Sequence, residues 1–305
     1  MEAIRGNHDQ IASARSYLNL LREVLPFDEF SKKTVNTRFD IWLQQGYKNV
    51  FNPSLFYEII DSTSSKIKAY DSKFQTLPYD RYVIGEVNTQ LDKDTGGFNS
   101  RYARGFKYFA NCGFAVVLSE RYTTNSEAVT LELARSYLHD CIHSASFRTI
   151  RVLPEGSKSK FPVYREQYGI NFRRANGTSY SALYSHEESP QRINLGVLMD
   201  GITVMMTAEH LTPYTTQLKS AELNDFERMI VSDIELDLDS LPDAYRGKGF
   251  HNNVTVPSQL FIEQRGGYEL YKHLVRAMLT GRMKDVVKYL GGGKFWKQLF
   301  KSESY

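Results

Sequence analysis

Two histidines and an aspartate stand close together in residues 126–144, SEAVTLELARSYLHDCIHS. His139 and His143 are four residues apart, so on a helix their imidazoles project from the same face, one turn above the other. Two neutral imidazoles in this arrangement can bind one metal ion. Asp140 follows the first histidine, where its carboxylate can act on a water bound to that metal. The spacing therefore predicts two ligands of a metal centre with a general base beside them.

A third ligand must come from elsewhere in the chain, because a catalytic zinc site takes three protein ligands and a water. Residues 193–211, INLGVLMDGITVMMTAEHL, are apolar on most sides, which predicts a buried helix that ends at Pro213. Asp200 is the only ionisable residue in the first turns of this helix. A lone carboxylate is costly to bury unless it is paired or bound to metal, so we predict Asp200 as the third ligand. Residues 186–188, His-Glu-Glu, are an alternative source of ligands, although such a run more often lies in a solvated loop.

The segment that carries the two histidines has the pattern of a helix. It contains neither Pro nor Gly, and Ser126 stands at the expected N-cap with an acidic residue after it. Its apolar residues recur at helical spacing rather than alternating as in a strand: Leu131, Ala134, Leu138, Cys141, Ile142 and Ala145. Strands are predicted at residues 82–87 and 113–119 before this helix, and at 149–153 and 163–174 after it. A strand therefore leads by a short turn into the helix that bears the histidines.

The motif HDCIH at residues 139–143 resembles the HExxH motif of zincin metallopeptidases, with aspartate in place of glutamate. The later run GVLMDGIT, at residues 196–203, resembles the helix that supplies the third ligand in gluzincin-like members of this family. The resemblance covers roughly residues 80–215. It implies an α+β, zincin-like fold in which a small mixed sheet packs on the metal-binding helix, followed by a mainly helical C-terminal lobe. This sequence departs from the family at Asp140 and Asp200, where each carboxylate is one methylene shorter than the usual glutamate.

The resemblance also implies a function and a set of roles. Zn²⁺ would be bound by His139, His143 and Asp200, and the substrate would be a protein or peptide. Asp140 would take a proton from the attacking water and pass it to the leaving amine. A tyrosine or histidine should stabilise the oxyanion, and we expect Tyr214 first and His210 second in this role.

Two other interpretations of the same residues stay open. Histidines four apart also occur by chance on helices, and the chain would then be a structural or interaction protein that retains a zincin-like scaffold. His139-Asp140 also resembles the His-Asp dyad of metal-dependent phosphohydrolases. Those enzymes need another histidine upstream on a neighbouring helix, and His8 is the only earlier histidine here. If the peptidase interpretation holds, we expect residues 113–119 to form an edge strand that pairs with an extended substrate.

Composition limits the class of protein. The chain has 305 residues, of which 41% are hydrophobic and 24% charged, as in ordinary globular proteins. A net charge of +3 argues against an obligate nucleic-acid binder. The two cysteines, Cys112 and Cys141, favour a reducing compartment. We find no signal peptide and no stretch of transmembrane length, so we expect a cytoplasmic protein, or a viral or bacterial effector delivered into a host cell without a cleavable signal.

The chain divides into three parts that we expect to form one continuous globular unit. Residues 1–80 are predicted to be a helical N-terminal segment, residues 81–215 the zincin-like core and residues 216–305 a helical C-terminal lobe. Outside the core, helices are predicted at residues 9–25, 219–239, 258–264, 267–280 and 282–290. The basic and aromatic run at residues 294–301, KFWKQLFK, is expected to pack on the core, with a membrane surface or a nucleic acid as less frequent partners.

Overall fold

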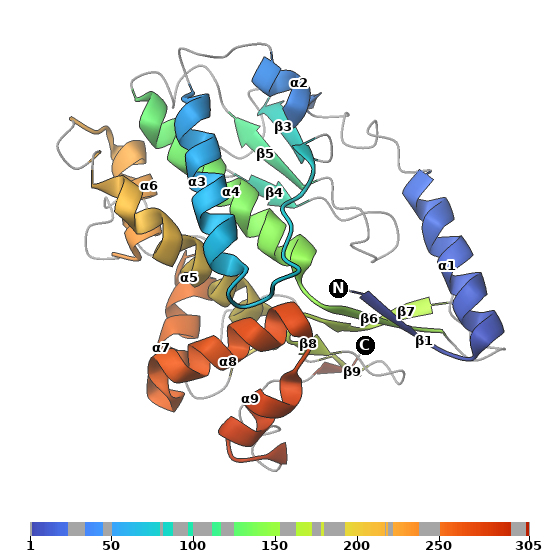
Figure 1. Cartoon of the computed structure of the whole chain (residues 1–305). Helices are drawn as coiled ribbons and strands as arrows, with labels where there is room; N and C mark the ends of the chain where they lie inside the picture. The colour runs from blue at the N-terminus through green and yellow to red at the C-terminus, as the bar shows by residue number, and fades with distance from the viewer. Residues whose placement is uncertain are drawn as a thin grey trace.

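The chain folds as an α+β protein built mostly from helices, as the sequence predicts. The computed structural model describes residues 2–23, 34–44, 51–79, 82–87, 97–99, 112–116, 125–152, 163–172, 178–179, 193–216, 218, 222–237, 251–293 and 303–304. Figure 1 shows helix α4, Ser126–Ala145, in the middle of the molecule, with sheet strands on one side and further helices on the other. The helix with the two histidines is therefore the element against which the other layers pack.

The helices of the described residues agree with the sequence in type and differ from it mainly at their ends. They are α1 His8–Glu23, α2 Phe39–Gln44, α3 Pro53–Ile67, α4 Ser126–Ala145, α5 Leu195–Thr215, α6 Asp225–Glu235, α7 Val256–Arg265, α8 Gly267–Thr280 and α9 Met283–Tyr289. A short π-helical turn, His251–Thr255, leads into α7. The predicted run at residues 294–301 lies outside the described residues.

Within the part of the chain that the structure describes, the strands form two four-stranded mixed sheets and one two-stranded pair. The first sheet has the order β1-β6-β7-β8, and the second has the order β2-β3-β5-β4. The strands are β1 Glu2–Arg5, β2 Thr34–Arg38, β3 Tyr82–Val87, β4 Gly97–Asn99, β5 Cys112–Val116, β6 Arg148–Val152, β7 Val163–Tyr168, β8 Asn171–Phe172, β9 Thr178–Ser179 and β10 Glu303–Ser304. The predicted strand at residues 82–87 is confirmed.

Three predictions about the sheets are wrong. Residues 1–80 are not purely helical, because β1 pairs with β6 and β2 pairs with β3. Residues 163–174 do not form one strand, since Gly169 turns the chain with a φ of 54° and β7 pairs with β8 as a hairpin. Strand β5 does not lie at an edge: β3 pairs with one side of it and β4 with the other. An extended substrate therefore cannot add to the sheet at β5.

Side-chain caps set the beginnings of the two helices that carry the predicted metal ligands. Helix α4 is capped by Asn125, not by Ser126 as predicted: the Asn125 Oδ1 accepts hydrogen bonds from the backbone N–H groups of Glu127 (3.0 Å) and Ala128 (3.2 Å). Helix α5 is capped in the same way by Asn194, whose Oδ1 accepts a hydrogen bond of 2.6 Å from the N–H of Gly196. These bonds satisfy N–H groups that have no partner within a helix.

Helix α5 also runs past the residue where we expected it to stop. Pro213 lies inside the helix, which continues to Thr215. A proline removes a single hydrogen bond this close to a helix end, and the last turn has other support. Thr215 is fully buried, and its hydroxyl donates to the carbonyl of Thr212 (2.8 Å). Local packing therefore outweighs the proline signal.

An aromatic cluster fixes the face of α4 that is turned away from the histidines. Phe39 of α2 and Phe56 of α3 lie with ring centroids 5.4 Å apart, and Tyr79 lies 5.4 Å from Tyr137 of α4. Tyr137 is two residues before His139, which places it about 200° around the helix. Its hydroxyl donates to the backbone carbonyl of Leu77. Burial of these rings therefore sets the rotation of α4 about its axis and hence the direction of the opposite face.

Candidate metal centre

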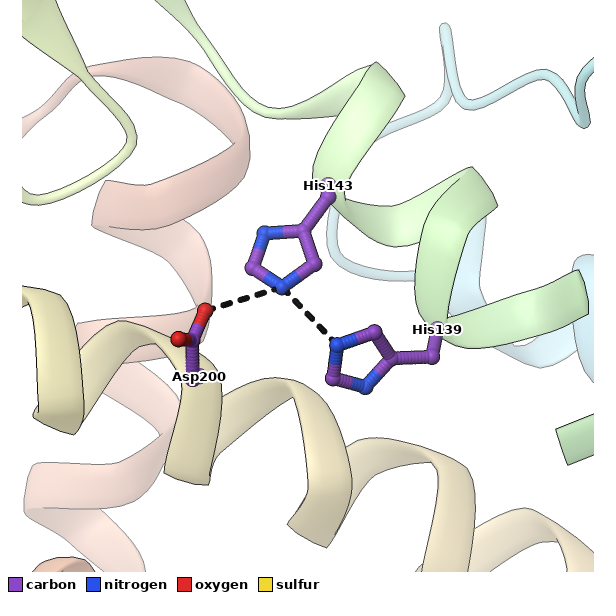
Figure 2. A group of neighbouring side chains, drawn as sticks. All are labelled: His139, His143 and Asp200. Atoms are coloured by element: carbon purple, nitrogen blue, oxygen red, sulfur yellow. Dashed lines mark hydrogen bonds and ion pairs between the residues drawn. The ribbon is translucent and has the colours of Figure 1, made fainter. Parts of the chain in front are cut away.

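The three predicted metal ligands meet where α4 passes α5 (Figure 2). His139 and His143 come from successive turns of α4, and their Nε2 atoms lie 3.1 Å apart. The Nε2 of His143 also lies 3.0 Å from the Oδ1 of Asp200 on α5. One ligand atom from each of the three residues falls within 4.8 Å of the others. The sequence prediction that these residues come together is confirmed, and such a group can hold a metal ion.

The spacing and chemistry of these atoms fit a transition-metal ion. In a tetrahedral zinc site, bonds of about 2.0–2.1 Å separate neighbouring ligand atoms by about 3.3 Å. The two measured separations, 3.1 and 3.0 Å, are close to this value. Two imidazoles and a carboxylate suit zinc and neighbouring first-row metals, whereas Ca²⁺ and Mg²⁺ prefer sites made of oxygen atoms alone. The third pair, His139 and Asp200, lies within 4.8 Å, so a bound ion would draw these two side chains together.

Burial differs among the three ligands. His143 is buried, with 4% of its surface exposed, whereas His139 and Asp200 are half-buried. The site is thus closed on the side of His143 and retains solvent-accessible surface at the other two ligands. A catalytic zinc site needs an open coordination position for water or substrate, and this arrangement is compatible with one.

Close packing of α5 against α7 helps to place Asp200. The neighbouring Gly201 has no room for a side chain: an added Cβ would lie 2.1 Å from the Oγ and 2.3 Å from the Cβ of Ser258 on α7. The Ser258 hydroxyl donates to the carbonyl of Val197, one turn earlier on α5 (3.3 Å). Glycine therefore lets the two helices approach at the level of the carboxylate.

We expect Gly201→Ala to destabilise the protein by about 1–3 kcal/mol, the usual cost of adding a methyl group to a packed interface. Thermal unfolding of the variant should show a lower midpoint. Combining the change with Ser258→Gly should restore most of the loss, because it removes the two closest atoms. Gly293→Ala is the control, since an added Cβ there meets no atom within 4 Å. An unchanged midpoint for Gly201→Ala would show that this contact does not constrain the two helices.

Asp140, the predicted general base, is not among the three grouped ligands. It lies on the same helix, about 60° around the axis from His143. Asp140 is buried, with 5% of its surface exposed. Asp140 is therefore on the ligand helix but not a ligand, and its role as the base stays a prediction.

The two predicted oxyanion residues lie away from the centre. His210 and Tyr214 follow Asp200 by ten and fourteen residues on the same continuous helix, α5. The rise of an α-helix separates them from Asp200 by about 15 and 21 Å along its axis. His210 is buried, its Nε2 has no hydrogen-bond partner among the described residues, and burial lowers its pKa. Tyr214 packs against the hydrophobic core. Neither residue is therefore assigned to the metal centre.

His8, the other histidine considered for a metal site, does not join the group. His8 is fully exposed at the start of α1 and its Nδ1 lies 3.6 Å from a carboxylate oxygen of Asp9. The upstream histidine that a phosphohydrolase site requires is therefore not His8. Residues 186–188 lie outside the described residues.

Cys141 lies within α4 but takes no part in the metal centre. Its Sγ accepts a hydrogen bond from the backbone N–H of Leu77 (3.3 Å), and burial raises the pKa of the thiol to about 12. The thiolate is the reactive form, so we expect iodoacetamide to leave Cys141 unmodified in the native protein at pH 8. Mass spectrometry of the peptide containing Cys141, with a guanidinium-unfolded sample as the reference, measures this. Equal labelling of the native and unfolded samples would contradict the buried position.

Two residues that the sequence did not reveal contact the buried ligand. The hydroxyl of Tyr168 donates to the backbone carbonyl of His143 (3.0 Å), and the Nη2 of Arg148 donates to the same oxygen (3.1 Å). Both residues lie on strands, and their partner is a main-chain atom. The spacing of side chains in the sequence therefore could not predict these contacts.

No protein-family model, no curated protein and no solved structure matches this chain. None of the helices that the structure describes combines the length and apolar character that a membrane span requires. The geometry of the site and the chemistry of its residues therefore carry the functional argument.

Proposed function

We propose that this chain is a zinc-dependent peptidase whose metal is held by His139, His143 and Asp200. The observation that carries the proposal is the meeting of these three side chains, from two helices far apart in the sequence, with His143 at separations from the other two ligands that are close to those of a tetrahedral site. The order of the ligands agrees with the resemblance to zincins. A protein or peptide is the substrate class that this resemblance favours.

In the proposed reaction, zinc would activate the water and the peptide carbonyl, and the side chain of Asp140 would transfer the proton. When bound, zinc lowers the pKa of a coordinated water and polarises a carbonyl group. Asp140 accepts the proton of the attacking water and returns it to the nitrogen of the leaving amine, so one water is consumed for each peptide bond broken. Aspartate needs a closer approach to this water than glutamate does, because its side chain is one methylene shorter.

The alternative is a structural or interaction protein that retains the scaffold without the reaction. The shorter carboxylate at Asp140 favours this alternative, because proton transfer depends on hydrogen-bond reach. Both proposals fit a reducing compartment such as the cytoplasm, since Cys141 is a buried free thiol.

A digest of a peptide library separates the two functions. The zinc-loaded protein should cleave a subset of peptides, and treatment with a chelator should stop cleavage until zinc is restored. The Asp200→Ala variant, which lacks one ligand, is the control for a contaminating peptidase. A wild-type protein that holds zinc and cleaves no peptide would overturn the peptidase proposal in favour of the non-catalytic alternative.

A further inference from the structure

The last turn of α4 ends in carbonyl groups that the helix itself does not satisfy. In a longer helix the carbonyl of His143 would accept from the N–H of residue 147. Here the N–H of Phe147 donates instead to the carbonyl of Met278 on α8 (2.9 Å). The carbonyl of the buried metal ligand accepts one long hydrogen bond of 3.3 Å from the N–H of the C-cap residue Ser146, and its other donors come from outside the helix.

The hairpin of β6 and β7 supplies these donors. The Arg148 guanidinium donates through Nη2 to the carbonyl of His143 (3.1 Å) and through Nη1 to that of Ser144 (2.6 Å). Tyr168 donates through its hydroxyl to the carbonyl of His143 (3.0 Å). Arg148 and Tyr168 are directly paired across the two strands. A cation at this end also opposes the negative pole of the helix dipole.

Tyr168 also contacts the imidazole of His143, and Arg148 lies against the tyrosine ring. The ring of Tyr168 stacks beside that of His143, with centroids 6.2 Å apart and planes 30° apart. The guanidinium of Arg148 lies over the ring of Tyr168, with its central carbon 5.0 Å from the centroid of that ring. Tyr168 is buried, so its ring has little freedom to move. His143 is thus fixed at its backbone and at its ring, while its Nε2 faces Asp200 (Figure 2).

We propose that Tyr168 and Arg148 are positioning residues of the metal centre, which hold His143 in the orientation that metal binding requires. This inference rests on the metal centre proposed above and adds two residues that do not touch the metal. A ligand that is already oriented loses less conformational freedom when the ion binds, so affinity should fall when the support is removed. A cap that only stabilised the helix would change the stability of the protein without changing the ligand field of the metal.

The test is titration of the full-length, metal-free protein with Co²⁺, followed by its visible absorption and by competition with a chelator. Tyr168→Phe, which keeps the ring and removes the hydroxyl, should raise the dissociation constant for Co²⁺ about tenfold and alter the absorption bands. Arg148→Lys keeps the charge and loses the planar fork, and it should act in the same direction. Thermal unfolding of each metal-free variant identifies any loss of folded protein.

Tyr271→Phe is the matched control. Tyr271 is a buried tyrosine whose hydroxyl donates to the Oε2 of Glu209 (3.2 Å), nine residues beyond Asp200 on α5. This variant should bind Co²⁺ with the affinity and spectrum of the wild type. Wild-type affinity and spectrum in both Tyr168→Phe and Arg148→Lys would overturn the positioning role and leave the metal centre standing. A wild-type protein that binds no Co²⁺ would instead overturn the metal centre and this inference with it.

Discussion

Asp140→Asn is expected to abolish peptide hydrolysis while leaving the metal content unchanged. The amide has nearly the shape of the carboxylate but cannot accept the proton of the attacking water. General-base catalysis contributes about 10²–10⁴-fold to the rate, and turnover should fall by that factor. The measurement is kcat/KM on a peptide that the wild type cleaves, together with elemental analysis of the same sample.

Asp140→Glu is the matched control for this experiment. It restores the longer carboxylate of the zincin motif and keeps the charge. We expect it to retain hydrolysis, because the base is preserved and gains reach. If Asp140→Asn cleaves peptides as fast as the wild type, Asp140 is not the base. If neither variant nor the wild type cleaves any peptide, the non-catalytic alternative is favoured.

His143→Gln is expected to lose most of the bound metal. The substitution removes the ligand atom that lies closest to both other ligands, at 3.1 Å from the Nε2 of His139 and 3.0 Å from the Oδ1 of Asp200. Glutamine fills similar space but offers an amide, which is a poor ligand for zinc beside imidazole and thiolate. Metal content should fall from about one ion per chain to a small fraction of that.

His210→Gln provides the comparison for this second variant. His210 is also a buried histidine, but it lies on α5 about 15 Å along the axis from Asp200. Its replacement should leave the metal content at the wild-type level. Equal losses in the two variants would indicate general destabilisation, and full metal content in His143→Gln would remove this residue from the site.

The parts of the site that the sequence predicts are those that depend on helical periodicity. His139 and His143 share a face because they are four residues apart, and helical spacing likewise predicts that Leu138 and Cys141 face the core, where both are buried. Asp200 could be predicted because a lone carboxylate in an apolar helix needs a partner. These inferences use only local spacing and the cost of burying a charge. Such reasoning requires no knowledge of the tertiary structure.

The features that could not be predicted depend on contacts between distant parts of the chain. Strand β1 has only four residues, EAIR, and pairs with β6 at Arg148–Val152, so no local pattern marks it. Arg135, which donates to both carboxylate oxygens of the buried Glu132 at 2.7 Å, also lies 3.9 Å from a carboxylate oxygen of Asp233 on α6. The oxyanion prediction for Tyr214 relied on a helix that stopped at Pro213, and packing of the last turn extends that helix.

Elemental analysis of the purified wild-type protein tests the central claim most directly. The metal centre predicts about one zinc ion per chain, and the His139→Ala variant, prepared in parallel, should lack it. A wild-type protein that contains no metal and takes up none when zinc is added would contradict the account. His139, His143 and Asp200 would then be a hydrogen-bonded group between two helices, and the peptidase proposal would fall.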